Sequence, residues 1–154
     1  SLVSHGEQLY IKWLYNFLTM SNTNDMIVVG SVDEIPQGKM KHVEVKGKEI
    51  VISNIGGKIY AIDDRCGHMN ALLSMGNVSN EGIVTCPFHG ASFDVTTGRK
   101  VREPNLTPPQ EMESLPQNWQ KLIEYVGQLM SHIKTYDQRT YETRVDGDLI
   151  KLKV

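Results

Sequence analysis

Each of the two cysteines in this chain is followed within three residues by a histidine. The motifs are Cys66-Gly67-His68 and Cys86-Pro87-Phe88-His89, and each follows a predicted strand and opens a loop. We expect Gly67 and Gly90 to let these loops turn tightly. If the two loops face one another, they bring two sulfurs and two imidazole nitrogens together. The spacing therefore predicts a metal site, and structural cysteines beside unrelated histidines are the weaker explanation.

The donor types alone leave the metal open. Two cysteines and two histidines suit a tetrahedral zinc ion, and they also suit a [2Fe–2S] cluster in which histidines replace two of the four thiolates. Zinc ligands usually come with like ligands paired along the chain. Here each motif carries one ligand of each kind, as expected where each loop gives a thiolate to one iron and an imidazole to the other.

The motifs and the residues after them, through Asp94 and Thr97-Gly98, resemble the Rieske [2Fe–2S] family, most closely its small soluble ferredoxins. The resemblance covers roughly 26–103 and resumes in the last part of the chain. It implies that Cys66 and Cys86 bind an inner iron and that His68 and His89 bind an outer iron near the surface. It also places a further set of residues in or over the cluster-binding loops: Gly67, Met69, Phe88, Gly90, Ser92 and Pro104.

Departures from the high-potential members of that family imply a low reduction potential. Those members carry a disulfide between the loops, at positions that are Ala71 and Phe88 here. They also carry a serine and a tyrosine whose hydroxyls donate to sulfur, where this chain has Ala91 and Phe93. Ser92 should point to the other face of its strand and not replace them. Because donors to sulfur stabilise the added electron, we expect a potential on the order of −150 mV.

Hydrophobic periodicity predicts a mostly β chain with two helical additions. Short alternating segments separated by turns indicate an antiparallel β-sandwich or barrel with a cluster-binding loop subdomain, and the terminal hairpin should pair with the first strands. Strands are expected at 26–29, 40–45, 49–53, 58–62, 82–85, 91–95, 141–145 and 149–154.

Two amphipathic segments lie outside the predicted β domain. We expect an N-terminal helical extension and linker at 1–25, with Leu9, Trp13 and Phe17 on one stripe, and a Rieske domain at 26–154. That domain should contain a helical insertion at about 105–136, begun by a capping box at Ser114 and Gln117. Both apolar stripes are expected to pack on the protein's own sheet, with a partner surface or a homo-oligomer contact as the alternative.

Composition disfavours several classes of function. Sixteen basic against eighteen acidic residues give a net charge of −2, which does not favour nucleic acid, and no apolar run is long enough to span a bilayer. We therefore expect a cytoplasmic protein. The remaining histidines are His5, His42 and His132, too scattered for the mononuclear iron site of an oxygenase.

These inferences predict an electron carrier and not an enzyme with its own substrate site. It would take one electron from a reductase and pass it to a terminal oxygenase or similar acceptor. The alternatives are a fixed small subunit of a reductase, similar to the Rieske-like subunit of nitrite reductases, and a structural zinc module.

Overall fold

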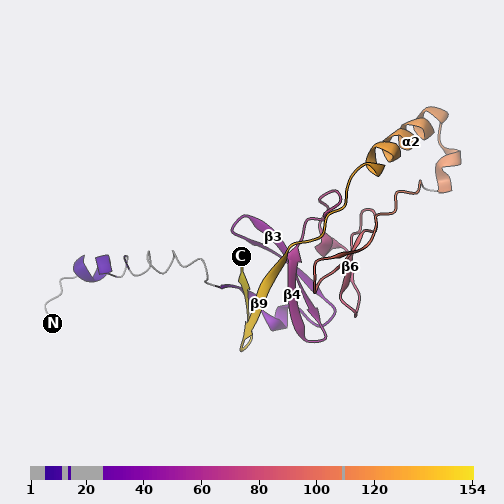
Figure 1. Ribbon diagram of the computed structural model, residues 1–154. Helices are drawn as coiled ribbons and strands as arrows, with labels where there is room; N and C mark the ends of the chain where they lie inside the picture. Colours follow the sequence, from indigo (N-terminus) through magenta and orange to yellow (C-terminus); the bar gives the residue numbers. More distant parts are fainter. Residues whose placement is uncertain (1–5, 12–13, 15–25, 109) are drawn as a thin grey trace.

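The computed structural model describes residues 6–11, 14, 26–108 and 110–154. Two antiparallel sheets form the body of this part of the chain (Figure 1). The larger sheet has six strands in the order β1-β10-β9-β4-β3-β2. Their bounds are β1 Ile27–Ser31, β2 Met40–Val45, β3 Lys48–Ile55, β4 Lys58–Asp63, β9 Thr140–Asp146 and β10 Leu149–Lys153.

The terminal hairpin completes this larger sheet, as the sequence predicts. β9 pairs with β4 through Ala61 and Tyr141, and β10 pairs with β1 through Ile27 and Leu152. Alternate residues of these strands face inward because side chains point to opposite faces of a strand in turn. They form a closed apolar core: Ile35, Ile50, Ile52, Ile59, Ala61, Tyr141, Ile150 and Leu152.

The smaller sheet supports the cysteine-containing loops. Its order is β5-β6-β7-β8, with β5 Asn77–Val78, β6 Ile83–Thr85, β7 Ser92–Asp94 and β8 Lys100–Arg102. The sequence predicts β6 and β7 but neither β5, which has only two residues, nor β8. A second core lies between this sheet and the larger one: Val51, Ile62, Cys66, Leu73, Val84, Cys86, Ala91, Phe93 and Val95.

The predicted helical insertion contains a helix, α2 (Gln117–Ser131), but the predicted cap is wrong. Pro116 occupies the N-cap position, and the Ser114 hydroxyl donates backward to the carbonyl of Glu111 at 2.7 Å. The reason is that Ser114 already ends a short 3₁₀ helix, η3 (Gln110–Ser114). Two other 3₁₀ turns, η1 (Val32–Glu34) and η2 (Leu73–Met75), lie in the β domain.

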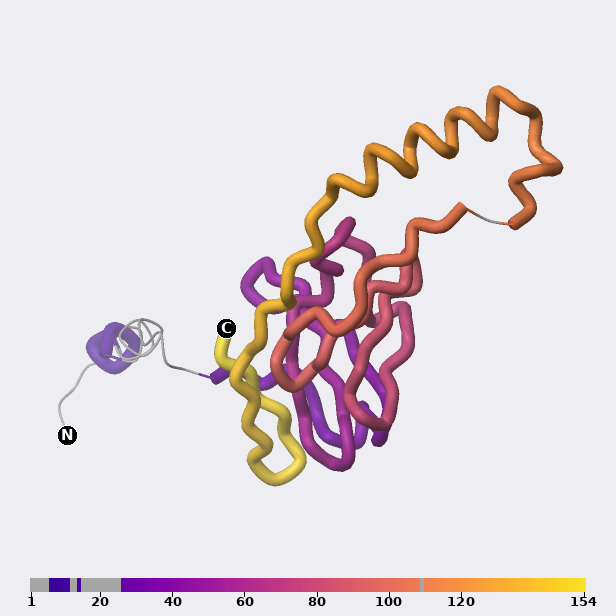
Figure 2. Tube along the Cα trace, turned by 45° about the vertical axis from the view of Figure 1, so that its right-hand side comes forward, coloured from indigo at the N-terminus to yellow at the C-terminus, as the bar shows by residue number. Residues whose placement is uncertain are grey.

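The expected packing of α2 on the sheet is also wrong. No residue of α2 is buried, and Trp119 and Leu129 are 55% and 53% exposed. The helix extends away from the strands, joined to them by two segments that run side by side (Figures 1 and 2). The apolar face of the larger sheet is already filled by that sheet's own strands, so no surface is left there for the helix to cover.

The N-terminal stripe is only partly described. Residues 6–11 and 14 are helical, and Leu9, Ile11 and Leu14 are exposed, so this part does not pack on the sheet either. Trp13 and Phe17 lie outside the described residues. In the part of the chain that the structure describes, no helix is long and apolar enough to cross a membrane.

Candidate metal centre

The two Cys/His motifs form loops with the same main-chain hydrogen bonds. In the first loop, Cys66 N donates to Ala71 O at 2.8 Å and Asn70 N donates to Cys66 O at 2.9 Å. In the second, Cys86 N donates to Ala91 O at 2.8 Å and the N–H four residues after the cysteine donates to Cys86 O at 3.1 Å. Each cysteine therefore begins a turn that closes on the residue five positions later.

A left-handed residue closes each turn. Asn70 has a φ of 62° and Gly90 has a φ of 75°, and both stand four residues after the cysteine. Gly90 thus has the expected conformation. Gly67 also lies in the turn of its loop, as expected, but without a positive φ. Its role is close approach, because a Cβ atom there would lie 2.1 Å from the carbonyl oxygen of Tyr136.

The four candidate donors meet between these loops. Cys66 and Cys86 are 1% and 3% exposed and lie at the base, in the same core as Phe93. The His68 and His89 rings lie edge to face, with their centroids 5.1 Å apart. The buried Nε2 of His68 and Nδ1 of His89 have no hydrogen-bond partner. Burying such atoms unpaired is costly, and a metal centre between the loops would satisfy them.

The protonation of these groups reflects their burial. Burial chiefly raises the pKa of the Cys66 thiol to about 11, and the neighbouring Cys86 adds to the rise. Burial also lowers the pKa of His68, helped by the nearby His89. A metal needs deprotonated thiols and neutral imidazoles, so the raised pKa of Cys66 means that loading this site releases a proton from that thiol.

Each loop supplies one thiol and one imidazole. A binuclear cluster with two thiolates at one iron and two imidazoles at the other uses such a set, and so does a tetrahedral zinc ion.

Comparison with known proteins decides between these possibilities. The family description "Rieske [2Fe-2S] domain" matches residues 25–137, most of the chain. The chain belongs to the Rieske [2Fe–2S] family. The cofactor of this Rieske protein is accordingly a [2Fe–2S] cluster, and the protein is an electron carrier and not a catalytic subunit.

Individual relatives agree with this assignment. The chain is 38% identical over 77 residues to the 3-phenylpropionate/cinnamic acid dioxygenase ferredoxin subunit of Escherichia coli. Those 77 residues are 50% of this chain and 72% of the relative. Its fold is similar to the ferredoxin of carbazole 1,9a-dioxygenase from Nocardioides aromaticivorans, with a TM-score of 0.61, 25% identity, and coverage of 82% and 95% of the two chains. The Sphingomonas yanoikuyae B1 ferredoxin has a TM-score of 0.60 at 20% identity, with coverage of 83% and 97%.

Apolar side chains flank the Rieske loops on the solvent side. Met69 is 39% exposed beside His68, and Phe88 is 63% exposed with its ring centroid 4.2 Å from that of His89. Pro104 is half-buried, and the next residue, Asn105, donates its N–H to the carbonyl of His89 at 2.7 Å. The segment at 104–105 therefore lies against the second loop, and a cluster-covering role for Pro104, with an ordinary turn proline as the alternative, stays a prediction.

The Ser92 hydroxyl faces away from the Rieske site, as expected. It lies 3.0 Å from the hydroxyl of Thr85 and donates to the carbonyl of Gly90 at 3.3 Å. Ala91 and Phe93, on the face toward the cysteines, are fully buried and carry no hydroxyl.

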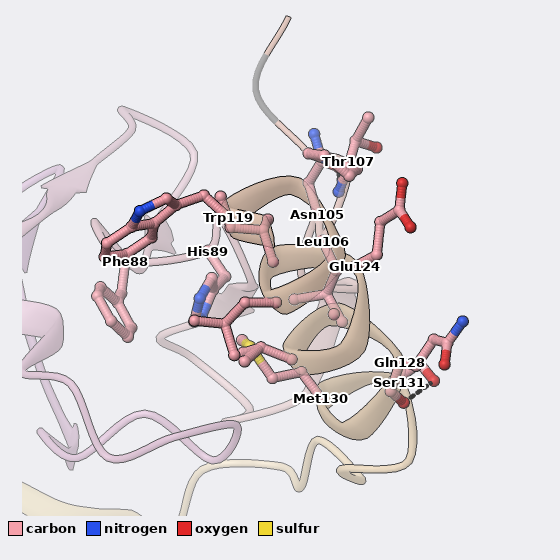
Figure 3. A pocket seen from close by; sticks show the side chains of 15 residues that line it. Phe88, His89, Asn105, Leu106, Thr107, Trp119, Glu124, Gln128, Met130 and Ser131 are labelled. Carbon is pink, nitrogen blue, oxygen red and sulfur yellow. Dashed lines mark hydrogen bonds between the residues drawn. The ribbon is translucent and has the colours of Figure 1, made fainter. Parts of the chain in front are cut away.

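A cleft of about 880 Å³ separates the second Rieske loop from α2. Phe88 and His89 line one side, the segment at 105–108 lines another, and the apolar face of α2 lines the third, including Trp119 and Met130 (Figure 3). The inserted helix therefore stands beside the histidine end of the site.

Two polar residues that support the first loop carry no recognisable sequence signal. Asp64 is fully buried and accepts from Ser74 N at 2.7 Å and from the Ser74 hydroxyl at 2.6 Å. A further contact joins Asp64 to Nδ1 of His42 at 2.5 Å, and His42 itself is an exposed residue of β2. Gln138 bonds the first loop from 71 positions away, a separation that no local pattern reveals.

Proposed function

We propose that this protein is a low-potential Rieske ferredoxin that carries one electron from a reductase to a terminal oxygenase or a similar acceptor. The observation that carries this proposal is the pair of matching loops, each of which combines a thiol buried in one shared core with an imidazole nitrogen that has no hydrogen-bond partner. The cytoplasmic location expected from the sequence remains a prediction.

In this proposal Cys66 and Cys86 hold the inner iron, and His68 and His89 hold the outer iron. The depth of the side chains supports this order, because both cysteines belong to the buried core, whereas His68 is 8% exposed and His89 is half-buried. When bound, the cluster accepts and releases a single electron. The exposed Phe88 and Met69 surround the histidine end, so a redox partner would approach the outer iron across apolar side chains.

The proposed potential is at the low end of the Rieske range, on the order of −150 mV. Fully buried Ala91 and Phe93 offer no hydroxyl to the cluster or to the cysteine sulfurs. Ala71 and Phe88 occupy the positions where high-potential members have the two cysteines of an inter-loop disulfide, so that bond is absent here. Fewer hydrogen bonds to sulfur leave the added electron less stabilised.

The proposed acceptor follows from the relatives. The E. coli relative is a dioxygenase ferredoxin subunit, and a similar fold, with a TM-score of 0.60 at 21% identity, occurs in the complex of oxygenase and ferredoxin in carbazole 1,9a-dioxygenase. A fixed small subunit of a reductase is the second candidate. The exposed apolar face of α2 favours it, because a permanent partner would cover that face.

The decisive experiment is anaerobic purification followed by iron, zinc and acid-labile sulfide analysis, with EPR after reduction. We expect two irons and two sulfides per chain and an EPR signal that appears only on reduction. Substituting Cys66→Ala or His89→Ala should abolish that signal, whereas His132→Ala, on the exposed surface, should leave it unchanged. Stoichiometric zinc without sulfide would contradict the proposal.

A further inference from the structure

Gln138 connects the segment after α2 to the first metal-binding loop. Its side chain is 94% buried, since the residue is only 6% exposed. The Oε1 atom accepts from Gly67 N at 2.7 Å, and Nε2 donates to the carbonyls of Asp63 at 2.9 Å and Arg65 at 2.8 Å. One amide group therefore bonds three main-chain groups between the end of β4 and His68.

The main chain of the same segment bonds to the carbonyl of Gly67, whereas the Gln138 side chain bonds to its N–H. Tyr136 N donates to Gly67 O at 3.0 Å, so both polar main-chain groups of Gly67 bond to residues 136–138. Gln138 N in turn donates to Gly98 O at 2.7 Å. The contacts are tight, because a Cβ atom at Gly98 would lie 2.0 Å from the Gln138 carbonyl oxygen.

Gly67 is the residue whose conformation determines how Cys66 and His68 point relative to one another. A glycine has more backbone freedom than any other residue, so an unrestrained Gly67 would let the two side chains vary in direction. The bonds from Gln138 and Tyr136 remove that freedom. They add to the local hydrogen bonds that the main-chain N–H groups of His68 and Met69 donate to Cys66.

We propose that Gln138 is a positioning residue that fixes Cys66 and His68 in the geometry the cluster requires. This inference rests on the proposed function, in which Cys66 and His68 bind different irons. Gln138 touches neither side chain and acts through the amide of Gly67. Its loss should therefore change the cluster's properties even where the fold survives.

The test is Gln138→Met, which keeps the length and packing of the side chain but removes all three hydrogen bonds. Gln117→Met, at the exposed start of α2, is the matched control. The measurements are the EPR spectrum of the reduced cluster, the midpoint potential, the rate of cluster loss, and hydrogen exchange in a peptide covering 66–70. We expect altered g values, a shifted potential, and cluster loss and amide exchange each roughly tenfold faster.

The outcomes separate this inference from the proposed function. A Gln138→Met protein that loads normally, with the EPR spectrum, potential and cluster lifetime of the control, would overturn the role of Gln138. A lower unfolding temperature with those three properties unchanged would also overturn it, because the residue would then be merely structural. If Gln138→Met does not fold, Gln138→Glu keeps an acceptor for Gly67 N and, with its carboxyl protonated, one donor for a carbonyl in place of Nε2. At acidic pH this variant should show slow exchange at 66–70 and a near-native EPR spectrum. Rapid exchange or a disordered spectrum there would overturn the inference, and absence of iron in the unsubstituted protein would instead refute the proposed function.

Discussion

Phe93 lies fully buried on the strand that follows the second loop, in the same core as both cysteines. High-potential Rieske proteins carry a tyrosine at the matching position, whose hydroxyl donates to a cysteine sulfur. A hydroxyl introduced here would be close to the cluster and shielded from water, where a hydrogen bond has a large electrostatic effect. The missing oxygen atom of this one side chain is therefore a main cause of the low potential we expect.

Substituting Phe93→Tyr should raise the midpoint potential from the low end toward the middle of the family range of about −150 to +300 mV. The matched control is Phe88→Tyr, since Phe88 is 63% exposed and a hydroxyl there would be solvated. Protein-film voltammetry on both variants measures the difference. A Phe93→Tyr potential equal to that of the control would argue against the hydrogen-bond explanation.

Tyr141 provides a second prediction at the residue scale. Burial, together with a hydrogen bond from its hydroxyl to Asp63, raises the pKa of Tyr141 to about 12, against about 10 in an unfolded chain. A raised pKa means that the folded state holds the proton more tightly. The resulting stabilisation is complete below about pH 10 and is lost as the pH rises toward 12.

We therefore expect the protein to lose on the order of 2 kcal/mol of unfolding free energy from this group between about pH 10 and pH 12. Tyr141→Phe has no proton to lose, so its stability should fall less steeply over the same interval. Denaturant titrations of both proteins at several alkaline pH values measure the difference. Parallel curves for the two proteins would show that the Tyr141 proton is not linked to folding.

At the scale of elements, α2 stands outside both apolar cores. Replacing residues 107–134 with a short Gly/Ser linker should therefore leave the unfolding temperature within a few degrees of the original and leave the reduced EPR spectrum unchanged. Extending the deletion to 105–138 also removes Asn105, Tyr136 and Gln138. This larger deletion should prevent the protein from binding the cluster. Calorimetry and EPR on the two deletions test this. Unfolding of the shorter deletion would mean that α2 is part of the core after all.

Sequence periodicity predicts the elements whose pattern is local. β2 and β4 alternate clearly, and both were found where expected. The cap at Ser114 and the packing of α2 were predicted wrongly, because each depends on what lies next to the segment in space. An apolar stripe indicates that a helix has a contact face, but not whether that face meets the protein's own sheet.

The same distinction holds within the site. The cysteine and histidine candidates follow from spacing, because ligands on short loops are close in sequence. Asn70, which closes the first turn, and Gln138, which holds Gly67, had no such signal. The residues that hold the ligands in place are scattered along the chain, so they can be identified only from the folded structure.

The whole molecule divides into a part that contains the candidate ligands and a part that does not. The core of the smaller sheet includes Cys66 and Cys86, whereas the core around Ile50 and Leu152 in the larger sheet contains neither. Loss of the cluster leaves buried thiols and imidazole nitrogens without partners only in the first of these.

Removing the cluster by oxidation and chelation should therefore reduce protection from amide exchange in one sheet more than in the other. We expect faster amide exchange in β5–β8 and in both loops, and little change in β9 and β10. Hydrogen exchange with mass spectrometry on the loaded and stripped protein measures this. Uniform loss of protection across both sheets would mean that the two cores unfold as one unit.

The insertion leaves and re-enters the β domain at hydrogen bonds to the two histidine loops. Asn105 N bonds the His89 carbonyl at one end, and Tyr136 N bonds the Gly67 carbonyl at the other. The Thr135 carbonyl between them accepts from Lys100 Nζ of β8 at 3.4 Å. A partner bound to α2 would therefore be linked to both histidine loops and to the smaller sheet through these few hydrogen bonds, without contacting the imidazoles itself.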